Sequence, residues 1–261
     1  MMVDPAIVCH GGAGHTAKDQ PGVDQATDKG WEILVGGGSA LDAAIAAVMH
    51  MEDDPVLNAG TGGKYRDDGS IQLDASIMTS DGRFGAVACI EETRNPIVVA
   101  AALLDSQLNM LVGRGARDFA DGLHIPREEV VGSKRKHASD TVGAVARDST
   151  GLIVVASSTG GCSGRPAGRV GDTPLIGAGL WCDANGGFAA TGIGEAITLD
   201  MSCIRVAERS ADTNVQEAMD WGLARFDESI EVGFIGLSTS GGGVGVANTG
   251  MPWAARSSED S

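Results

Sequence analysis

The chain has 261 residues, of which 43% are hydrophobic, so it can bury a substantial core as one large domain or two small ones. Its 35 acidic residues outnumber 19 basic ones, and the formal net charge of -16 argues against a nucleic-acid partner, whose backbone would be repelled. The longest apolar runs stop well short of the roughly 20 residues that a membrane-spanning helix needs, so we expect no membrane partner.

The cysteines and the N-terminal residues indicate the compartment. Five cysteines are scattered along the chain and odd in number, which argues against a disulfide framework or a zinc knuckle, so we expect reduced thiols. The first residues, MMVDPAIVCHGG, lack the basic segment, the apolar segment and the small-residue cleavage site of a secretory signal. Both observations favour a cytoplasmic protein.

The N-terminal part of the chain combines strand-like and helix-like segments. The apolar run AIVCHGG predicts a buried strand at 6–12 that enters a tight loop, and two helices are expected after it. The second helix begins at Ser39, because Ser39 and Asp42 form a capping-box pattern, and it extends to about Met51. Glycines and paired aspartates predict loops and a turn at 58–69.

The next segments predict a pair of strands, a pair of helices and a linker. Residues 70–78 and 84–90 are strand-like and are expected to pair antiparallel. Helices are expected at 96–108 and 116–123. The segment at about 126–140 has little periodicity and mixed charges, which is typical of a linker.

From Thr141 onward the pattern changes to strands. Two apolar runs, 141–148 and 152–159, are joined by a short turn and predict a hairpin. The other expected elements are a strand at 186–194, helices at 195–208 and about 214–226, and strands at 231–239 and 242–248. Strands in hairpins and helices in consecutive pairs predict an α+β fold, with stacked antiparallel sheets covered by layers of helices.

Three threonines stand where a nucleophile could act. Thr141 opens a strand directly after the predicted linker, Thr159 ends the partner strand, and Thr191 precedes a strand-to-helix turn. A threonine hydroxyl is a weak nucleophile until a base removes its proton, and a free α-amino group with a pKa of about 7.7 to 8.0 can be that base. Cleavage between Asp140 and Thr141 would place base and nucleophile on one residue. These positions therefore predict a self-cleaving hydrolase.

Several motifs in sequence order resemble the plant-type L-asparaginase and isoaspartyl peptidase family of N-terminal nucleophile hydrolases. They are IVCHGGAG, VLNAGTGGKYRDDGSIQLDASIM, DTVGAVARDSTG, SSTGG, GRVGDTPLIGAG and ATGIGEA, and together they cover nearly the whole chain. The resemblance implies a four-layer αββα sandwich that forms a single domain over 1–261. It also implies cleavage into an α-subunit, 1–140, and a β-subunit, 141–261, and assembly as a homodimer of α/β heterodimers.

The resemblance also implies roles for single residues. Thr141 matches the family's nucleophile, and Thr159 matches the neighbouring hydroxyl that tunes it. Thr191 and Gly192 match the oxyanion hole, which binds the negative charge that develops during acyl transfer. Asn58, in the NAG motif, matches an asparagine that lines the site from the other half of the chain.

A second group of residues would bind the substrate or an ion. Arg169 and Asp172, in GRVGD, match the pair that holds the substrate α-carboxylate and α-ammonium, and the chemistry agrees because a guanidinium suits a carboxylate and a carboxylate suits an ammonium. Gly194 matches a further backbone contact. No cofactor is required for the chemistry, but a structural Na⁺ is expected in a loop whose members are Met51, Glu52, Asp54, Leu57, Ala59 and Thr61.

The expected reaction is hydrolysis of L-asparagine to L-aspartate and ammonia, or of β-aspartyl dipeptides, through an acyl-enzyme on Thr141. The sequence leaves the preference open, because both substrates present the same aspartyl half to Arg169 and Asp172. Two other functions also stay open at this point: a glycosylasparaginase-like amidase, and a family member that is never cleaved and has no catalytic activity.

Overall fold

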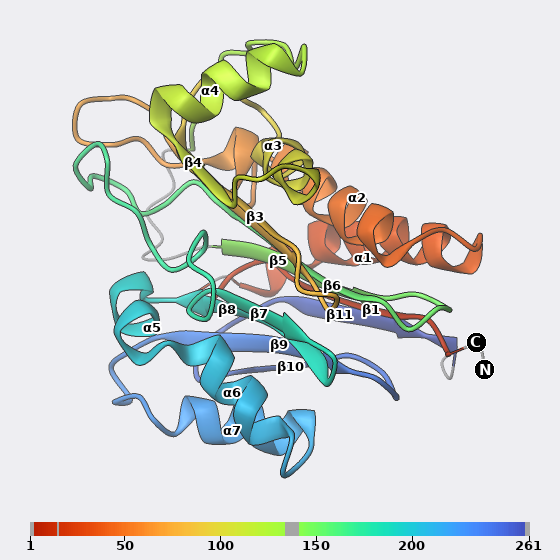
Figure 1. Ribbon diagram of the computed structural model, residues 1–261. Coiled ribbons are helices and arrows are strands. Elements are labelled where there is room, and N and C mark those ends of the chain that lie inside the picture. Colours follow the sequence, from red (N-terminus) through yellow and green to blue (C-terminus); the bar gives the residue numbers. More distant parts are fainter. Residues whose placement is uncertain (1–2, 15, 134–140, 259–261) are drawn as a thin grey trace.

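Two β-sheets are stacked face to face, and helices cover the outer face of each (Figure 1). The computed structural model describes residues 3–14, 16–133 and 141–258. The order of layers is helices, sheet, sheet, helices, so the expected α+β fold with a four-layer αββα arrangement is confirmed.

The larger sheet has seven strands in the order β11-β1-β5-β6-β2-β3-β4, and neighbours are antiparallel except for β3 and β4. Its strands are β1 (Ala6–His10), β2 (Leu73–Thr79), β3 (Phe84–Ile90), β4 (Met110–Val112), β5 (Thr141–Arg147), β6 (Ile153–Thr159) and β11 (Trp253–Ser257). The smaller sheet is antiparallel, in the order β10-β9-β8-β7. Its strands are β7 (Leu180–Asp183), β8 (Gly186–Gly192), β9 (Val232–Ser238) and β10 (Val244–Ala247).

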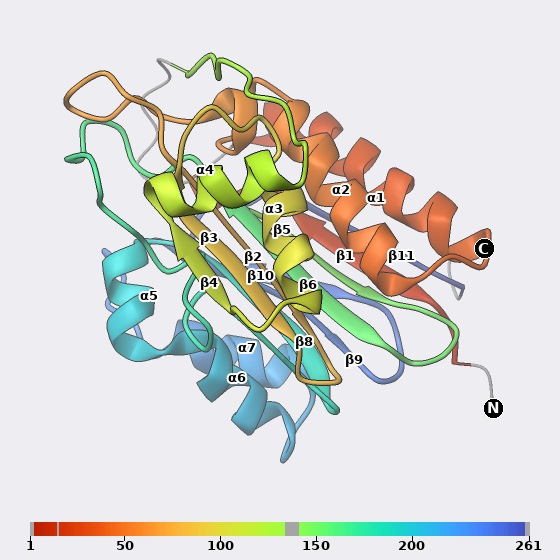
Figure 2. The same cartoon turned by 45° about the horizontal axis from the view of Figure 1, so that its top comes forward.

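Helices from the two halves of the chain cover opposite faces (Figures 1 and 2). The larger sheet carries α1 (Gln20–Val35), α2 (Ala40–Asp53), α3 (Pro96–Ala102) and α4 (Gly113–Gly122). The smaller sheet carries α5 (Gly194–Asp200), α6 (Ser202–Ser210) and α7 (Val215–Leu223). Short 3-10 turns lie at Ala17–Asp19, Gly60–Gly62 and Leu103–Asp105. Within the described ranges, no helix is long and apolar enough to cross a membrane.

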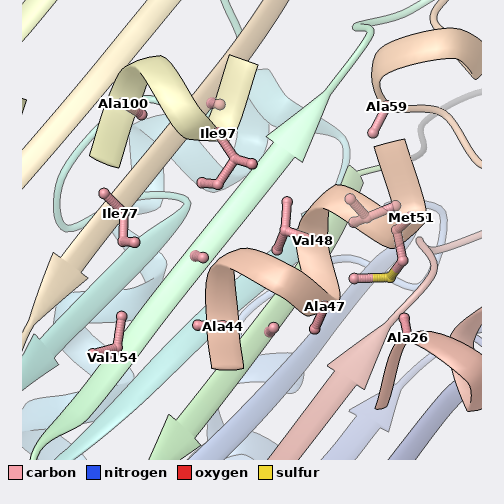
Figure 3. Packing of buried hydrophobic residues seen from close by; sticks show 14 of the residues in the cluster. Ala26, Ala44, Ala47, Val48, Met51, Ala59, Ile77, Ile97, Ala100 and Val154 are labelled. Carbon is pink, nitrogen blue, oxygen red and sulfur yellow. The ribbon is translucent and has the colours of Figure 1, made fainter. Parts of the chain in front are cut away.

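Three apolar clusters hold the four layers together. The first joins the helices α1, α2, α3 and α4 to the larger sheet, and Figure 3 shows Ala44 and Val48 of α2 and Val154 of β6 among its members. The second lies between the two sheets, and the third joins the smaller sheet to α5, α6 and α7. Burial of apolar side chains on both faces of each sheet stabilises the stack.

Most predicted elements are present with shifted ends. The two expected strand pairs form as β2 with β3 and β5 with β6. The predicted cap of α2 is also confirmed, because the Ser39 hydroxyl accepts a hydrogen bond from the Asp42 amide at 3.1 Å.

The prediction of one helix over 195–208 is wrong. Met201 adopts a left-handed conformation with φ of 53° and divides the segment into α5 and α6. A left-handed residue cannot continue a right-handed helix, so the chain turns at this point. The short strands β4, β7 and β11 were not predicted either.

Candidate active site

The predicted nucleophile lies where the inner face of the larger sheet changes from apolar to polar. Asp74, Thr159 and Thr141 are directly opposite one another across β2, β6 and β5. Directly opposite residues point to the same face of a sheet, and side chains alternate along each strand. Farther along the same face, the side chains that fill the layer between the sheets are Val8, Met78, Val145 and Val155. The polar row therefore lies at one end of the inter-sheet layer.

A pocket opens at this end of the strands. It is lined by Thr141, Thr159, Gly161, Cys162, Arg169, Gly171, Asp172, Thr173, Gly192 and Gly194. Elements of both sheets contribute, because Thr141 opens β5, Thr159 ends β6 and Gly192 ends β8. Six predicted site residues are thus brought together from positions scattered over the second half of the chain.

The Thr141 hydroxyl is held among other hydroxyl groups. Thr141 is 5% exposed, and its Oγ1 lies 3.2 Å from Oγ1 of Thr173. Thr159 is the strand partner of Thr141, and its own Oγ1 accepts a hydrogen bond from the Gly161 amide at 3.0 Å. Thr141 is therefore buried in a polar surrounding yet reaches the pocket.

Asn58 lies behind the pocket wall. Its side-chain Nδ2 donates to the carbonyl of Gly161 at 2.7 Å, and its main-chain carbonyl accepts from the Gly160 amide at 3.0 Å. Gly160 also passes so close that a Cβ there would lie 2.6 Å from the Asn58 Oδ1 atom. The asparagine therefore supports the two glycines that follow β6, one of which lines the pocket.

Arg169 and Asp172 line the pocket on the segment between β6 and β7. Arg169 is paired with Glu195 through two hydrogen bonds, Nε to Oε1 at 3.1 Å and Nη2 to Oε2 at 2.8 Å. Asp172 is 3% exposed, and its Oδ2 has no hydrogen-bond partner among the described residues. Burial raises the pKa of Asp172 to about 7, against its own backbone hydrogen bond and the Arg169 charge.

Two glycines pack too closely for a side chain. A Cβ on Gly194 would lie 2.8 Å from Oδ1 of Asp172 and 3.0 Å from Nη2 of Arg169. Gly192 has a φ of 140°, and a Cβ there would lie 2.2 Å from the carbonyl oxygen of Glu231. Only glycine fits these two positions without displacing the carboxylate or the backbone.

The Thr191 side chain has a structural contact. It is fully buried, and its Oγ1 accepts a hydrogen bond from the Ala13 amide at 3.1 Å. The contact joins β8 of the smaller sheet to the glycine loop that follows β1 of the larger sheet. Thr191 thereby fixes the backbone that leads into Gly192.

The cleavage position and part of the predicted linker lie outside the described residues. Asp140 belongs to that part, as do the linker residues from 134 onward. The described part of the linker includes Ser133, whose amide donates to the carbonyl of Gly63 at 2.8 Å. Ser133 of the linker thus lies beside Gly63, in the loop that follows Asn58.

Sequence reasoning missed the pocket residues Gly161, Cys162 and Gly171, and it missed two side chains that contact predicted site residues. Thr173 contacts Thr141 through its hydroxyl, and Glu195 pairs with Arg169. Both immediately follow a residue that was identified, since Thr173 comes after Asp172 and Glu195 comes after Gly194. Their polar character was a signal, but their orientation depends on how the loop folds back.

The predicted sodium loop winds around two glycines after α2. The carbonyl oxygen of Glu52 lies 2.4 Å from the position that a Cβ would take on Gly60. Those of Leu57 and Asp54 lie 1.6 Å and 3.3 Å from the corresponding position on Gly62. The glycines thus allow three backbone oxygens to pack against one short segment.

Comparison with known proteins gives matches along the whole chain. The sequence profile of the family described as Asparaginase matches residues 3–137 and 124–261. The isoaspartyl peptidase/L-asparaginase of Macaca fascicularis is 36% identical over 97% of this chain and 93% of its own length. The protein of the same name from Homo sapiens is 35% identical over the same shares. The plant-type L-asparaginase of Pyrobaculum calidifontis is 34% identical over 90% of this chain and 91% of its own length.

Proposed function

This chain belongs to the asparaginase family, and we propose that it is a threonine amidohydrolase that hydrolyses L-asparagine or β-aspartyl dipeptides after cleavage before Thr141. The observation that carries the proposal is that Thr141, Arg169 and Asp172 line one pocket. The names of the relatives, isoaspartyl peptidase/L-asparaginase and plant-type L-asparaginase, support this substrate class.

The new N-terminus supplies the base for the reaction. The α-amino group of Thr141 takes the proton of its own hydroxyl, and Oγ1 attacks the side-chain carbonyl of the substrate. The backbone at Thr191 and Gly192 stabilises the developing oxyanion. Ammonia, or the amine of the second amino acid, leaves with a proton. Water then hydrolyses the acyl-enzyme and releases aspartate.

The two ends of the aspartyl group select the substrate. The Arg169 guanidinium binds the α-carboxylate, and Asp172 binds the α-ammonium. The buried Asp172 Oδ2 without a hydrogen-bond partner supports this role, because a buried carboxylate oxygen gains stability from a cationic donor. The Glu195 side chain, 51% exposed, holds Arg169 in place from the solvent side.

An assay of three amides tests the proposed activity. We expect the purified, cleaved protein to release aspartate from L-asparagine or a β-aspartyl dipeptide and to leave N-acetylglucosaminyl-asparagine largely intact. Measuring kcat/KM for each substrate decides the class. Faster turnover of the glycosylated substrate would mean a glycosylasparaginase instead. A chain that stays uncleaved and hydrolyses none of the three would mean a non-catalytic family member.

We also propose that cleavage divides one domain, 1–261, into an α-subunit of residues 1–140 and a β-subunit of residues 141–261. The interleaving of strands supports this division, because β5 of the second segment lies between β1 of the first and β6. Non-covalent contacts would therefore hold the two segments together after cleavage.

The segment Met51–Thr61 is proposed to bind Na⁺ through backbone oxygens. The approach of the Glu52, Asp54 and Leu57 carbonyls to Gly60 and Gly62 supports this site. The ion would have a structural role at the end of α2. We expect the melting temperature to be higher in sodium chloride than in choline chloride at equal ionic strength, by a few degrees. Equal melting temperatures in the two salts would contradict the proposal.

A dimer of α/β heterodimers in the cytoplasm completes the proposal. The chain has a mass of 26.5 kDa, so light scattering of the cleaved protein should give about twice this value. A mass equal to that of one chain would contradict the dimer. The cytoplasmic location stays a prediction from the sequence.

A further inference from the structure

Gln72, just before β2, and Ser76, within β2, form hydrogen bonds with the segment that carries Arg169 and Asp172. The Oε1 atom of Gln72 accepts a hydrogen bond from the Gly168 amide at 2.7 Å. The Ser76 hydroxyl donates to the carbonyl of Thr173 at 2.5 Å. Side chains two positions apart point to the same face of a strand. Gln72 and Ser76 therefore hold the two ends of segment 168–173.

Asp74 lies between these two contacts. It is fully buried, and it faces Thr159 across the strand pair. Its Oδ1 accepts a hydrogen bond from the Cys89 amide at 2.7 Å, at a point where the pairing of β2 with β3 shifts by one residue. Cys89 itself has a φ of 51°. A β-bulge of this kind changes the direction of neighbouring side chains, and here the Asp74 carboxylate closes it.

The Asp74 carboxylate also has cationic neighbours. Arg66 is 3% exposed, and its guanidinium donates from Nη2 to the carbonyl of Gln72 at 3.1 Å and packs against Gly161 of the pocket wall. Burial raises the pKa of Asp74 to about 6, and the Cys89 amide, the Arg66 and Arg169 charges and the Gly171 amide oppose that rise. The Arg66 and Arg169 charges thus lie close enough to Asp74 to favour its ionised form.

We propose that Gln72, Asp74 and Ser76 are positioning residues. Gln72 and Ser76 hold segment 168–173 by hydrogen bonds where Arg169 and Asp172 receive the aspartyl end of the substrate, and the buried Asp74 between them fixes the bulge beside them. The proposal rests on the proposed function and extends it to residues that do not touch the substrate. Loss of these contacts displaces Arg169 and Asp172, whereas Thr141 stays fixed by its pairing with Thr159 in the larger sheet and loses only its neighbour Thr173. The effect should therefore fall mainly on substrate affinity and only weakly on the chemical step.

The decisive experiment compares Asp74→Ala, Asp74→Asn and the wild-type protein after cleavage. We expect Asp74→Ala to raise KM for L-asparagine at least about 10-fold while kcat changes less than about 3-fold. Asp74→Asn keeps an acceptor for the Cys89 amide and should recover most of the affinity. Asp81→Ala, at an exposed carboxylate in the turn between β2 and β3, is the matched control and should behave like wild type.

The pH dependence of binding separates positioning from a general loss of structure. L-Aspartate presents the same α-carboxylate and α-ammonium, and its binding should weaken as the pH falls through about 7, where Asp172 becomes protonated. Asp74→Asn removes a negative charge that raises the pKa of Asp172, so this loss should move to lower pH. The ionisable groups near Asp172 are Arg169, Asp74, Glu195, Cys162 and Cys203.

Several outcomes would overturn the proposal. A wild-type KM in Asp74→Ala would do so, as would a fall in kcat at unchanged KM. If Asp74→Ala does not fold or cleave, the double variant Gln72→Ala with Ser76→Ala removes both end contacts without changing the charge, and an unchanged KM there has the same meaning. Calorimetric titration with L-aspartate keeps the test separate from the proposed function, because it measures affinity even if the wild-type protein hydrolyses neither substrate.

Discussion

Replacing Thr141 with alanine should leave a single uncut chain with at least about 1000-fold less amidase activity than wild type. The substitution removes the hydroxyl that attacks both the preceding peptide bond and the substrate. Gel electrophoresis under denaturing conditions detects cleavage, and ammonia release from L-asparagine measures activity. Both should be lost together, because one oxygen atom performs both reactions.

Two further variants make the Thr141 experiment specific. Thr141→Ser keeps a hydroxyl and the future amine on one residue, so it should still cleave and retain part of the activity. Thr150→Ala changes an exposed threonine in the turn at the other end of the same hairpin and should match wild type. Full activity in uncut Thr141→Ala would contradict the assigned nucleophile.

Replacing Arg169 with leucine should lower kcat/KM for L-asparagine roughly 100-fold, mainly through KM. The guanidinium is 12% exposed in the pocket and is held by Glu195. Leucine cannot pair with the α-carboxylate, so the charged end of the substrate loses its partner in a partly buried site. Steady-state kinetics over a range of L-asparagine concentrations measures the effect.

The control for Arg169 is an exposed arginine that does not line the active-site pocket. Arg114 is 93% exposed on α4, and Arg114→Leu should leave both kcat and KM unchanged. Arg169→Lys keeps the charge but loses the planar fork, so its KM should fall between those of wild type and Arg169→Leu. An unchanged KM in Arg169→Leu would show that the carboxylate binds elsewhere.

The sequence contained enough local signal to predict the strands that carry the nucleophile. The runs that became β5 and β6 are apolar, short and separated by a clear turn, so Thr141 and Thr159 could be placed at one end of a hairpin. Pairing within a hairpin depends on neighbouring residues. The structure confirms this placement.

The missed strands depend on contacts between distant parts of the chain. β11 pairs with β1, about 250 residues away in sequence, and β4 has only three residues at the edge of the larger sheet. Short segments of this kind have weak periodicity, so tertiary pairing decides their structure. Met201 is similar, because a left-handed methionine between two helices has no signature in the sequence.

The positions of Arg169 and Asp172 also depend on contacts between distant parts of the chain. Their motif indicated carboxylate and ammonium binding through resemblance, but the residues that hold the motif in place lie about 100 positions earlier, at Gln72, Asp74 and Ser76. A period of two in a strand predicts that these three share a face. Which loop that face meets depends on how the two sheets stack.

N-terminal sequencing of the purified, active protein tests the central claim most directly. The account predicts two chains in equal amounts, the second beginning with TVGAV, because activity depends on a free amine on Thr141. An active preparation in which no chain begins at Thr141 would contradict it.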